Sequence, residues 1–166
     1  MKTLFLVRHA KSSWKDSSLS DIERPLNERG RKSAGLIGDL LSKRNTRLDR
    51  MYTSPANRAL STARLLAGSM NYPVDSIRVR EELYEGSIGR MLSVIRDTPA
   101  DIASVMLIGH NPAIQLLAEQ LSPFEENAFP TCAVLHLEFE MESWESIDDV
   151  QGSIRAYEYP KKYRKE

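Results

Sequence analysis

Two of the three histidines in this 166-residue sequence closely follow apolar runs that are typical of buried strands. His9 follows residues 3–7 with Arg8 directly before it, and His110 comes two residues after the run 104–108. A neutral imidazole can attack phosphorus as a nucleophile, and a protonated imidazole can stabilise developing charge. An arginine offers a planar, permanently charged fork of donors to phosphoryl oxygens. These residue types therefore indicate phosphoryl chemistry.

Two further arginines extend this set. Arg58 lies one helical turn after Ser54, which follows the predicted strand 48–53. Arg24 follows a polar, serine-rich segment, residues 11–23, which we interpret as a long loop over the end of the first strand. Arginines placed in this way could hold the oxygens of a dianionic phosphoryl group while one imidazole attacks phosphorus in line.

Structural explanations compete with this interpretation. A single histidine at a strand end is more often a hydrogen-bonded structural residue than a catalyst, and Arg8 alone could form an ordinary salt bridge. The combination of two histidines and two arginines near strand ends favours a functional site over these explanations. His136 differs, because it lies in the middle of the alternating segment 131–140 among glutamates, and we expect it to face solvent.

Three glutamates cluster after the third predicted strand, at Glu81, Glu82 and Glu85. A solvated turn is the simpler interpretation for Glu81 and Glu85. One of the three could instead be a general acid that protonates a leaving oxygen. The sequence pattern alone does not choose among them.

Length and composition limit the class of protein. With 166 residues, 41% of them apolar, we expect a single domain over residues 1–166 that can bury a substantial core. The formal net charge is zero, which gives no global attraction to nucleic acid or to a membrane surface.

The first apolar run is too short for a signal peptide, and the single cysteine, Cys132, excludes an internal disulfide. We therefore expect a cytoplasmic protein without nucleic-acid or membrane partners. We expect no metal or other cofactor, since two histidines without a carboxylate cluster make a poor site for hard cations.

Strands and helices alternate along most of the predicted chain, and the C-terminal part consists of two strands. We expect strands at 3–7, 48–53, 77–79, 104–108, 131–140 and 153–159. We expect helices at 28–43 with Asn27 as N-cap, from Ser54-Pro55 to about 70, at 86–96 and at 112–121, with a frayed basic tail after 160. This order predicts a three-layer α/β/α domain with a mostly parallel central sheet and an antiparallel C-terminal edge. Parallel strands end on the same side of a sheet, so the polar groups at their ends could converge.

Five segments that carry these residues resemble a known family. They are residues 6–12, 24–30, 54–59, 82–86 and 108–112. In this order and combination they resemble the histidine phosphatase superfamily, also called phosphoglycerate mutase-like, and within it the small SixA-type branch of phosphohistidine phosphatases. The resemblance implies the phosphoglycerate mutase-like fold.

The resemblance also implies roles for individual residues. His9 would carry the covalent phosphohistidine intermediate. The phosphate pocket around it would be formed by Arg8, Arg24, Arg58 and His110. Glu82 matches the place where many relatives have a proton donor, four residues before a glycine. One departure is Ala10, where the superfamily usually has glycine after the Arg-His pair.

The chain has no room for the large insertions that form a cap in mutases and phytases. An open pocket suits a phosphate presented on a protein surface, such as phosphohistidine on a phosphotransfer domain, and would also admit small phosphoesters. The leading hypothesis is therefore a metal-independent phosphatase for protein phosphohistidine. The alternatives are an enzyme for small phosphomonoesters, a mutase, which would need a lid to exclude water, and a phospho-ligand-binding module without turnover.

Overall fold

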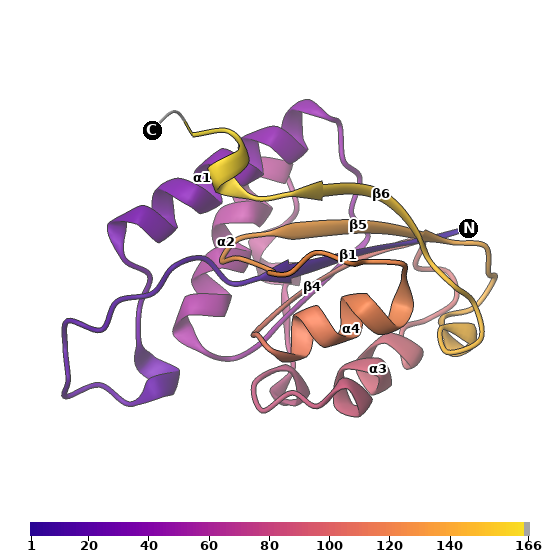
Figure 1. Ribbon diagram of the computed structural model, residues 1–166, viewed down its shortest axis with the longest axis horizontal. Coiled ribbons are helices and arrows are strands. Elements are labelled where there is room, and N and C mark those ends of the chain that lie inside the picture. Colours follow the sequence, from indigo (N-terminus) through magenta and orange to yellow (C-terminus); the bar gives the residue numbers. More distant parts are fainter. Residues whose placement is uncertain (165–166) are drawn as a thin grey trace.

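A mixed β-sheet forms the centre of the protein. The computed structural model describes residues 1–164, and within them the strands follow the order β3-β2-β4-β1-β5-β6 across the sheet (Figure 1). The strands are β1 (Lys2–Arg8), β2 (Arg50–Thr53), β3 (Arg78–Val79), β4 (Ser104–Gly109), β5 (Val134–Phe139) and β6 (Ser153–Glu158). Strands β1 to β4 pair in parallel, whereas β5 pairs antiparallel with both β1 and β6. The predicted parallel sheet with an antiparallel C-terminal edge is confirmed.

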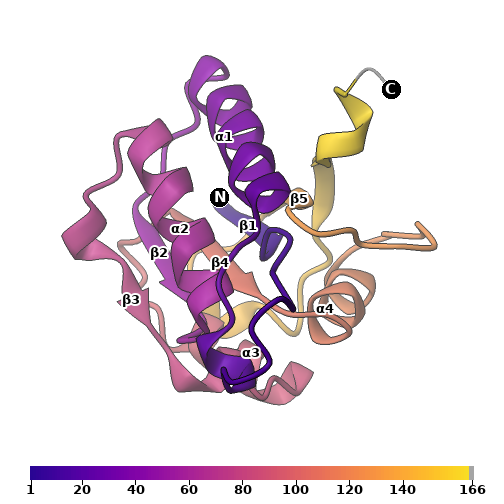
Figure 2. The same ribbon diagram turned by 90° about the vertical axis from the view of Figure 1, so that its left-hand side faces the viewer.

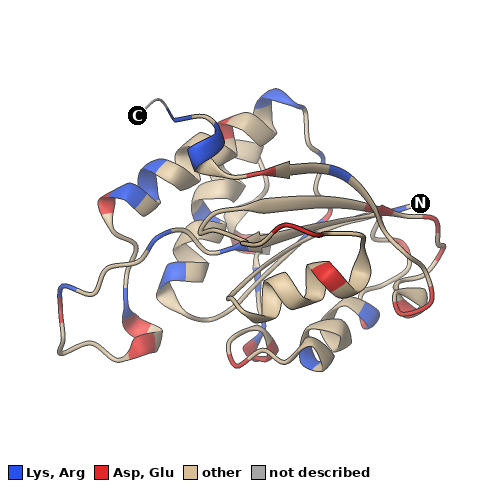
Figure 3. Ribbon diagram, viewed as in Figure 1, with Lys and Arg blue, Asp and Glu red and all other residues tan. Residues whose placement is uncertain are grey.

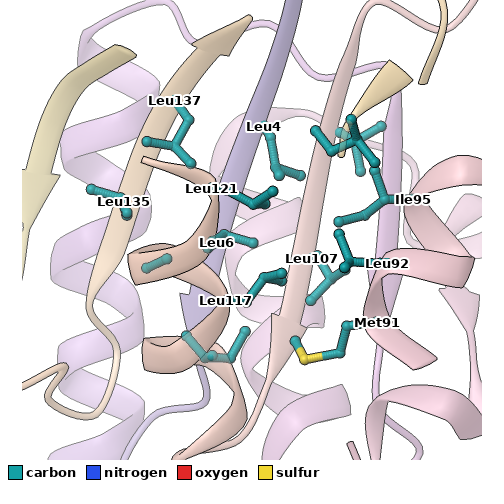
Figure 4. Close-up of a cluster of buried hydrophobic side chains, with 14 of the residues drawn as sticks. Leu4, Leu6, Met91, Leu92, Ile95, Leu107, Leu117, Leu121, Leu135 and Leu137 are labelled. Atoms are coloured by element: carbon teal, nitrogen blue, oxygen red, sulfur yellow. The ribbon is translucent and has the colours of Figure 1, made fainter. Parts of the chain in front are cut away.

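Helices cover both faces of this sheet (Figure 2). They are α1 (Glu28–Lys43), α2 (Asn57–Met70), α3 (Ile88–Arg96) and α4 (Ala113–Leu121). Successive side chains of a strand point to opposite faces, so Leu4 and Leu6 of β1 pack with α3 and α4, whereas Phe5 and Val7 pack with α1 and α2. Figure 4 shows the first of these two cores, in which Leu107 of β4 lies beside Leu92 of α3. Burial on both faces therefore makes this the expected three-layer domain.

The start of α1 is tied to the end of β1. Asn27 is the N-cap, and its side chain accepts a hydrogen bond from the Gly30 backbone nitrogen at 2.8 Å, which satisfies one of the free amides of the first turn. A Cβ atom at Gly30 would lie 2.1 Å from the carbonyl oxygen of Lys11. Only glycine therefore allows the helix to approach the segment that directly follows the candidate site residues.

Helix α2 begins later than predicted. Its first residue is Asn57 with Ala56 as N-cap, so Ser54 and Pro55 lie before the helix and not in its first turn. The Ser54 backbone nitrogen donates to the Ile108 carbonyl oxygen at 3.1 Å, which continues the pairing of β2 with β4 by one residue. This bond keeps Ser54 in the sheet, and the helix starts only after the chain has turned.

Two predictions about the C-terminal part are wrong. His136 is half-buried, and its ring stacks on Phe5 with centroids 4.5 Å apart, because β5 lies inside the sheet between β1 and β6. The tail after residue 160 is not frayed over the part that the structure describes. It forms a short 3-10 helix, and Arg164 donates to the hydroxyl of Ser33 on α1. The last two residues of this tail, 165–166, lie outside the described part of the chain.

Candidate active site

The carboxyl ends of β1, β2 and β4 bring together four of the six sequence-predicted site residues, which are Arg8, His9, Arg58 and His110. Arg8 of β1 is aligned with Gly109 of β4, and His9 and His110 directly follow these partners. The two imidazole rings lie with their centroids 5.0 Å apart and their planes at 52°. Arg58 joins them from the first turn of α2, which follows β2. The convergence that a parallel sheet predicts is therefore present.

His9 is held as a neutral imidazole with one ring nitrogen available for attack. Its side chain is buried, and its Nδ1 lies 2.7 Å from the Ala10 carbonyl oxygen. A carbonyl oxygen only accepts, so Nδ1 carries the hydrogen and Nε2 keeps its lone pair. Burial lowers the pKa of His9 to about 4, and the charge of Arg58 adds to the effect. At neutral pH the ring is uncharged and able to act as a nucleophile.

His110 is positioned by the residue that extends β2. Its Nε2 lies 2.8 Å from the Ser54 hydroxyl oxygen, which also accepts a hydrogen bond from the Ala56 backbone nitrogen at 3.2 Å. The Ser54 hydroxyl keeps its own hydrogen to donate, and when it donates to Nε2 the ring hydrogen of His110 lies on Nδ1. Burial, followed by the neighbouring His9, lowers the pKa of His110 to about 3. Both histidines are therefore neutral at pH 7 in the free protein.

The arginines are each held by one edge of the guanidinium group. Arg8 donates from Nη1 to the Phe129 carbonyl oxygen at 3.0 Å. Arg58 donates from Nη1 to the Asp21 carbonyl oxygen at 2.7 Å and from Nη2 to the Asp21 carboxylate at 3.0 Å. In both side chains the Nε atom is buried and has no hydrogen-bond partner. Each arginine therefore keeps a buried Nε donor that is not committed to another protein group.

These uncommitted donors mark a ligand site. Within residues 1–164, the buried side-chain nitrogen and oxygen atoms without a hydrogen-bond partner are Arg8 Nε, Arg58 Nε and His110 Nδ1. Buried polar groups in folded proteins are almost always paired, and an unpaired one destabilises the fold by about 1–3 kcal/mol. All three belong to the same group of residues around His9. An anion with several oxygens, such as a phosphoryl group, would satisfy them together.

Arg24 shares the Asp21 carboxylate with Arg58, and its place in a phosphate pocket stays a prediction. Its Nε donates to the Asp21 carboxylate at 3.2 Å and its Nη1 to the Ser12 hydroxyl at 2.8 Å. Its guanidinium carbon lies 3.4 Å from the ring centroid of Trp14, which is 76% exposed. This cation–π contact places the loop of residues 11–23 beside the site.

Glu82 has a partner of its own outside this group. Its carboxylate accepts a hydrogen bond from Arg80 Nη2 at 2.6 Å, and this bond lowers the pKa of Glu82. Among the described residues it forms no hydrogen bond with His9 or His110. A proton donor near neutral pH needs a raised pKa, and the bond to Arg80 shifts the pKa of Glu82 in the other direction. The role of Glu82 as a proton donor stays a prediction.

Two residues of the site were missed by sequence reasoning. The Asp21 carboxylate contacts Arg58 and Arg24, and it accepts a hydrogen bond from the Tyr84 hydroxyl at 2.8 Å. Partial burial opposes ionisation of Asp21, but the bonds from Tyr84 and Arg58 outweigh it and lower its pKa to about 2. Tyr84 also lies edge-on to the His110 ring, with centroids 5.8 Å apart. The only sequence signal for Asp21 was its position three residues before an arginine.

Within the described part of the chain, no three histidine, cysteine or carboxylate side chains lie close enough together to form a metal site. No helix in residues 1–164 is long and apolar enough to cross a bilayer.

A mixed, mostly parallel sheet with helices on both faces, which presents two histidines and partly uncommitted arginines at the carboxyl edge of its parallel strands, has the phosphoglycerate mutase-like fold. The model of the histidine phosphatase superfamily (branch 1) matches residues 4–93 of the chain, which is more than half of it. The protein belongs to the histidine phosphatase superfamily.

Individual relatives agree with this assignment. An uncharacterized protein of Mycobacterium tuberculosis, Rv1276c, is 32% identical over 112 residues, which cover 68% of this chain and 67% of that protein. The phosphohistidine phosphatase SixA of Escherichia coli is 29% identical over 124 residues, covering 74% of this chain and 75% of SixA. A solved structure of the protein histidine phosphatase SixA complexed with tungstate superposes with a TM-score of 0.83 at 26% identity, covering 98% of this chain and 99% of the other. The chain is therefore similar to SixA in fold over nearly its whole length.

Proposed function

We propose that this protein is a metal-independent phosphatase that forms a covalent phosphohistidine intermediate on His9 and acts on phosphohistidine side chains of other proteins. The observation that supports it best is the group of three unpartnered buried nitrogens beside a neutral His9 whose Nε2 keeps its lone pair. Such a group combines a nucleophile with donors for the oxygens that gain charge in the transition state.

In the first step, His9 Nε2 attacks phosphorus, and the bond from phosphorus to the leaving atom breaks. Arg8 Nε, Arg58 Nε and His110 Nδ1 then donate to the phosphoryl oxygens. The Ala10 carbonyl oxygen accepts from His9 Nδ1 and stabilises the positive charge that the ring gains when Nε2 forms its new bond. The leaving nitrogen or oxygen takes up a proton from solvent, and the water that attacks in the second step returns one to solvent.

In the second step, a water molecule attacks the phosphorus of phospho-His9. The bond between phosphorus and Nε2 breaks, inorganic phosphate leaves with the oxygen of that water, and neutral His9 is restored. The net reaction consumes one water and one phosphorylated group. A phosphoramidate has a labile leaving group, so the absence of a raised-pKa carboxylate at Glu82 weighs less for phosphohistidine than for a phosphoester.

Similarity to the phosphohistidine phosphatase SixA over about three quarters of each chain supports a protein substrate. A second candidate function is hydrolysis of small phosphomonoesters, because the same side chains would bind the phosphoryl group of such a substrate. A binding module without turnover is disfavoured because both histidines are present with their orienting hydrogen bonds.

The test is a hydrolysis assay with EDTA present, using para-nitrophenyl phosphate and a phosphotransfer domain phosphorylated on histidine. Wild type is compared with His9→Ala, and His136→Gln is the matched control because His136 is half-buried, stacks on Phe5 and forms no ring contact with His9 or His110 among the described residues. We expect turnover by wild type and by the control, loss of turnover in His9→Ala, and a higher kcat/KM on the phosphoprotein. Full activity of His9→Ala would refute the covalent mechanism, and a preference for the small ester would favour the second candidate.

A further inference from the structure

A single carboxylate ties together three segments at the edge of the candidate site. The two carboxylate oxygens of Asp21 accept hydrogen bonds from Arg58 Nη2 at 3.0 Å, from Arg24 Nε at 3.2 Å and from the Tyr84 hydroxyl at 2.8 Å. Its carbonyl oxygen accepts from Arg58 Nη1 at 2.7 Å. Asp21 therefore holds both nitrogens at the end of Arg58 and one nitrogen of Arg24.

The loop that carries Asp21 is itself well anchored. Residues 11–23 leave the end of β1 and pass outside the three layers before the chain enters α1 (Figure 1). Asp21 starts a short 3-10 helix that a capping box closes, in which the Ser20 backbone nitrogen and hydroxyl donate to the Glu23 carboxylate at 3.0 and 2.7 Å. Figure 3 shows this turn as an acidic segment on the returning part of the loop. The Asn57 side chain of α2 also donates to the Glu23 carbonyl oxygen at 3.1 Å.

A carboxylate beside a phosphoryl site has two conceivable effects of opposite sign. It can compete with the phosphoryl group for the arginines and repel its charge, or it can hold the arginines in the geometry that binds the group. The contacts of Arg58 distinguish these effects. Asp21 occupies only the outer edge of the guanidinium, and Arg58 Nε stays buried without a partner.

Orientation of a donor before binding increases affinity because a long, flexible side chain then loses less freedom on binding. An arginine without Asp21 would have to be ordered by the substrate itself. We infer that Asp21 is a positioning residue of this site, which orients Arg58 and Arg24 for a phosphoryl group, and that the loop of residues 11–23 serves to carry it. This inference rests on the proposed function.

The test compares Asp21→Asn with Asp16→Asn. Asp16 lies on the same loop and is exposed, and its carboxylate bonds only to Ser18 among the described residues, so it is a matched control for charge and loop position. Calorimetric titration with inorganic phosphate gives the affinity of the site without turnover, and steady-state kinetics on para-nitrophenyl phosphate give kcat and KM separately. Thermal unfolding shows whether each variant is folded.

We expect Asp21→Asn to weaken phosphate affinity at least about tenfold, the value of one well-placed charge-assisted hydrogen bond, and to raise KM more than it lowers kcat. Asp21→Glu should restore part of the affinity, and Asp16→Asn should leave it within about twofold of wild type. Tyr84→Phe, which removes one hydrogen bond to Asp21 and keeps the ring, should weaken affinity in the same direction but less. Tyr84→Phe replaces Asp21→Asn in the comparison if Asp21→Asn does not fold.

Unchanged or tighter phosphate binding by folded Asp21→Asn would overturn the inference, since Asp21 would then compete with the phosphoryl group. Loss of thermal stability without loss of affinity would also overturn it, because the role would be structural only. If wild type binds phosphate but hydrolyses neither substrate, the proposed function fails, and the calorimetric comparison still decides the role of Asp21.

Discussion

The burial of His9 in its neutral form has a consequence for stability that can be measured directly. The pKa of His9 is about 4 in the folded protein because burial and the charge of Arg58 disfavour the protonated ring, whereas the ordinary value is 6.5. The unfolded chain therefore binds a proton to this residue at pH values where the folded protein does not. The stabilising contribution is complete above the unfolded pKa and is lost as the pH falls from about 6.5 towards 4.

The variant His9→Asn isolates this contribution. The asparagine side-chain nitrogen lies near the position of His9 Nδ1 and can still donate to the Ala10 carbonyl oxygen, but the side chain does not titrate. For a pKa that moves from 6.5 to about 4, the loss on going from about pH 8 to about pH 5 is about 2 kcal/mol. We expect wild type to lose about 2 kcal/mol more unfolding free energy than His9→Asn over this interval.

Urea unfolding of both proteins at the two pH values measures this difference. The denaturant dependence of the free energy should be the same in all four curves, so that the midpoints report stability alone. His110 contributes its own loss in both proteins, because its pKa of about 3 keeps it neutral in the folded state at both pH values. Equal losses for wild type and His9→Asn would refute the argument that His9 is held neutral, and with it the state of the nucleophile in the mechanism.

Further predictions concern turnover and folding. In wild type, kcat/KM should fall on the acidic side with an apparent pKa near 4, as the candidate nucleophile is protonated in the free enzyme, and a limb near 6.5 would contradict this. Ser54→Ala should lower kcat/KM about fivefold, because it removes the hydrogen bond that orients His110 and is worth about 1 kcal/mol; an unchanged value would contradict that role. Gly30→Ala should destabilise the fold by about 1–3 kcal/mol in thermal or urea unfolding, because its Cβ would lie 2.1 Å from the Lys11 carbonyl oxygen. Gly35→Ala is the matched control on the same helix, has nothing within 4 Å of its Cβ, and should instead stabilise by about 0.5–1 kcal/mol.

Strand prediction worked best where one local pattern determines the structure. The apolar runs at 3–7 and 104–108 are buried on both faces, and a segment of that kind has few stable alternatives to a central strand. The start of α1 at Glu28 was also predictable, since the Asn27 cap acts on a backbone amide only three residues away. The start of α2 was not, because the residue that delays it bonds to Ile108, more than fifty residues further along the chain.

The same distinction explains the misplaced His136. Alternating apolar and polar side chains predict a strand with one solvent-exposed face. This prediction is correct only if no other part of the chain covers that face. Phe5 lies opposite His136 in the register of β1 and β5, and their rings stack. That contact joins segments at opposite ends of the sequence, so no pattern within residues 131–140 could indicate it.

The sequence by itself determined that Arg8, His9, Arg58 and His110 would meet, because parallel strands that end in polar residues share one edge of the sheet and chain order sets which residues follow each strand. Tertiary structure decided the rest of the site: that burial lowers the pKa of His9 and His110, that Glu82 bonds to Arg80, and that Asp21 reaches both arginines. Burial and side-chain pairing depend on which distant segments pack together. A loop residue such as Asp21 belongs to no periodic sequence pattern, so the sequence around it does not indicate which side chains it contacts.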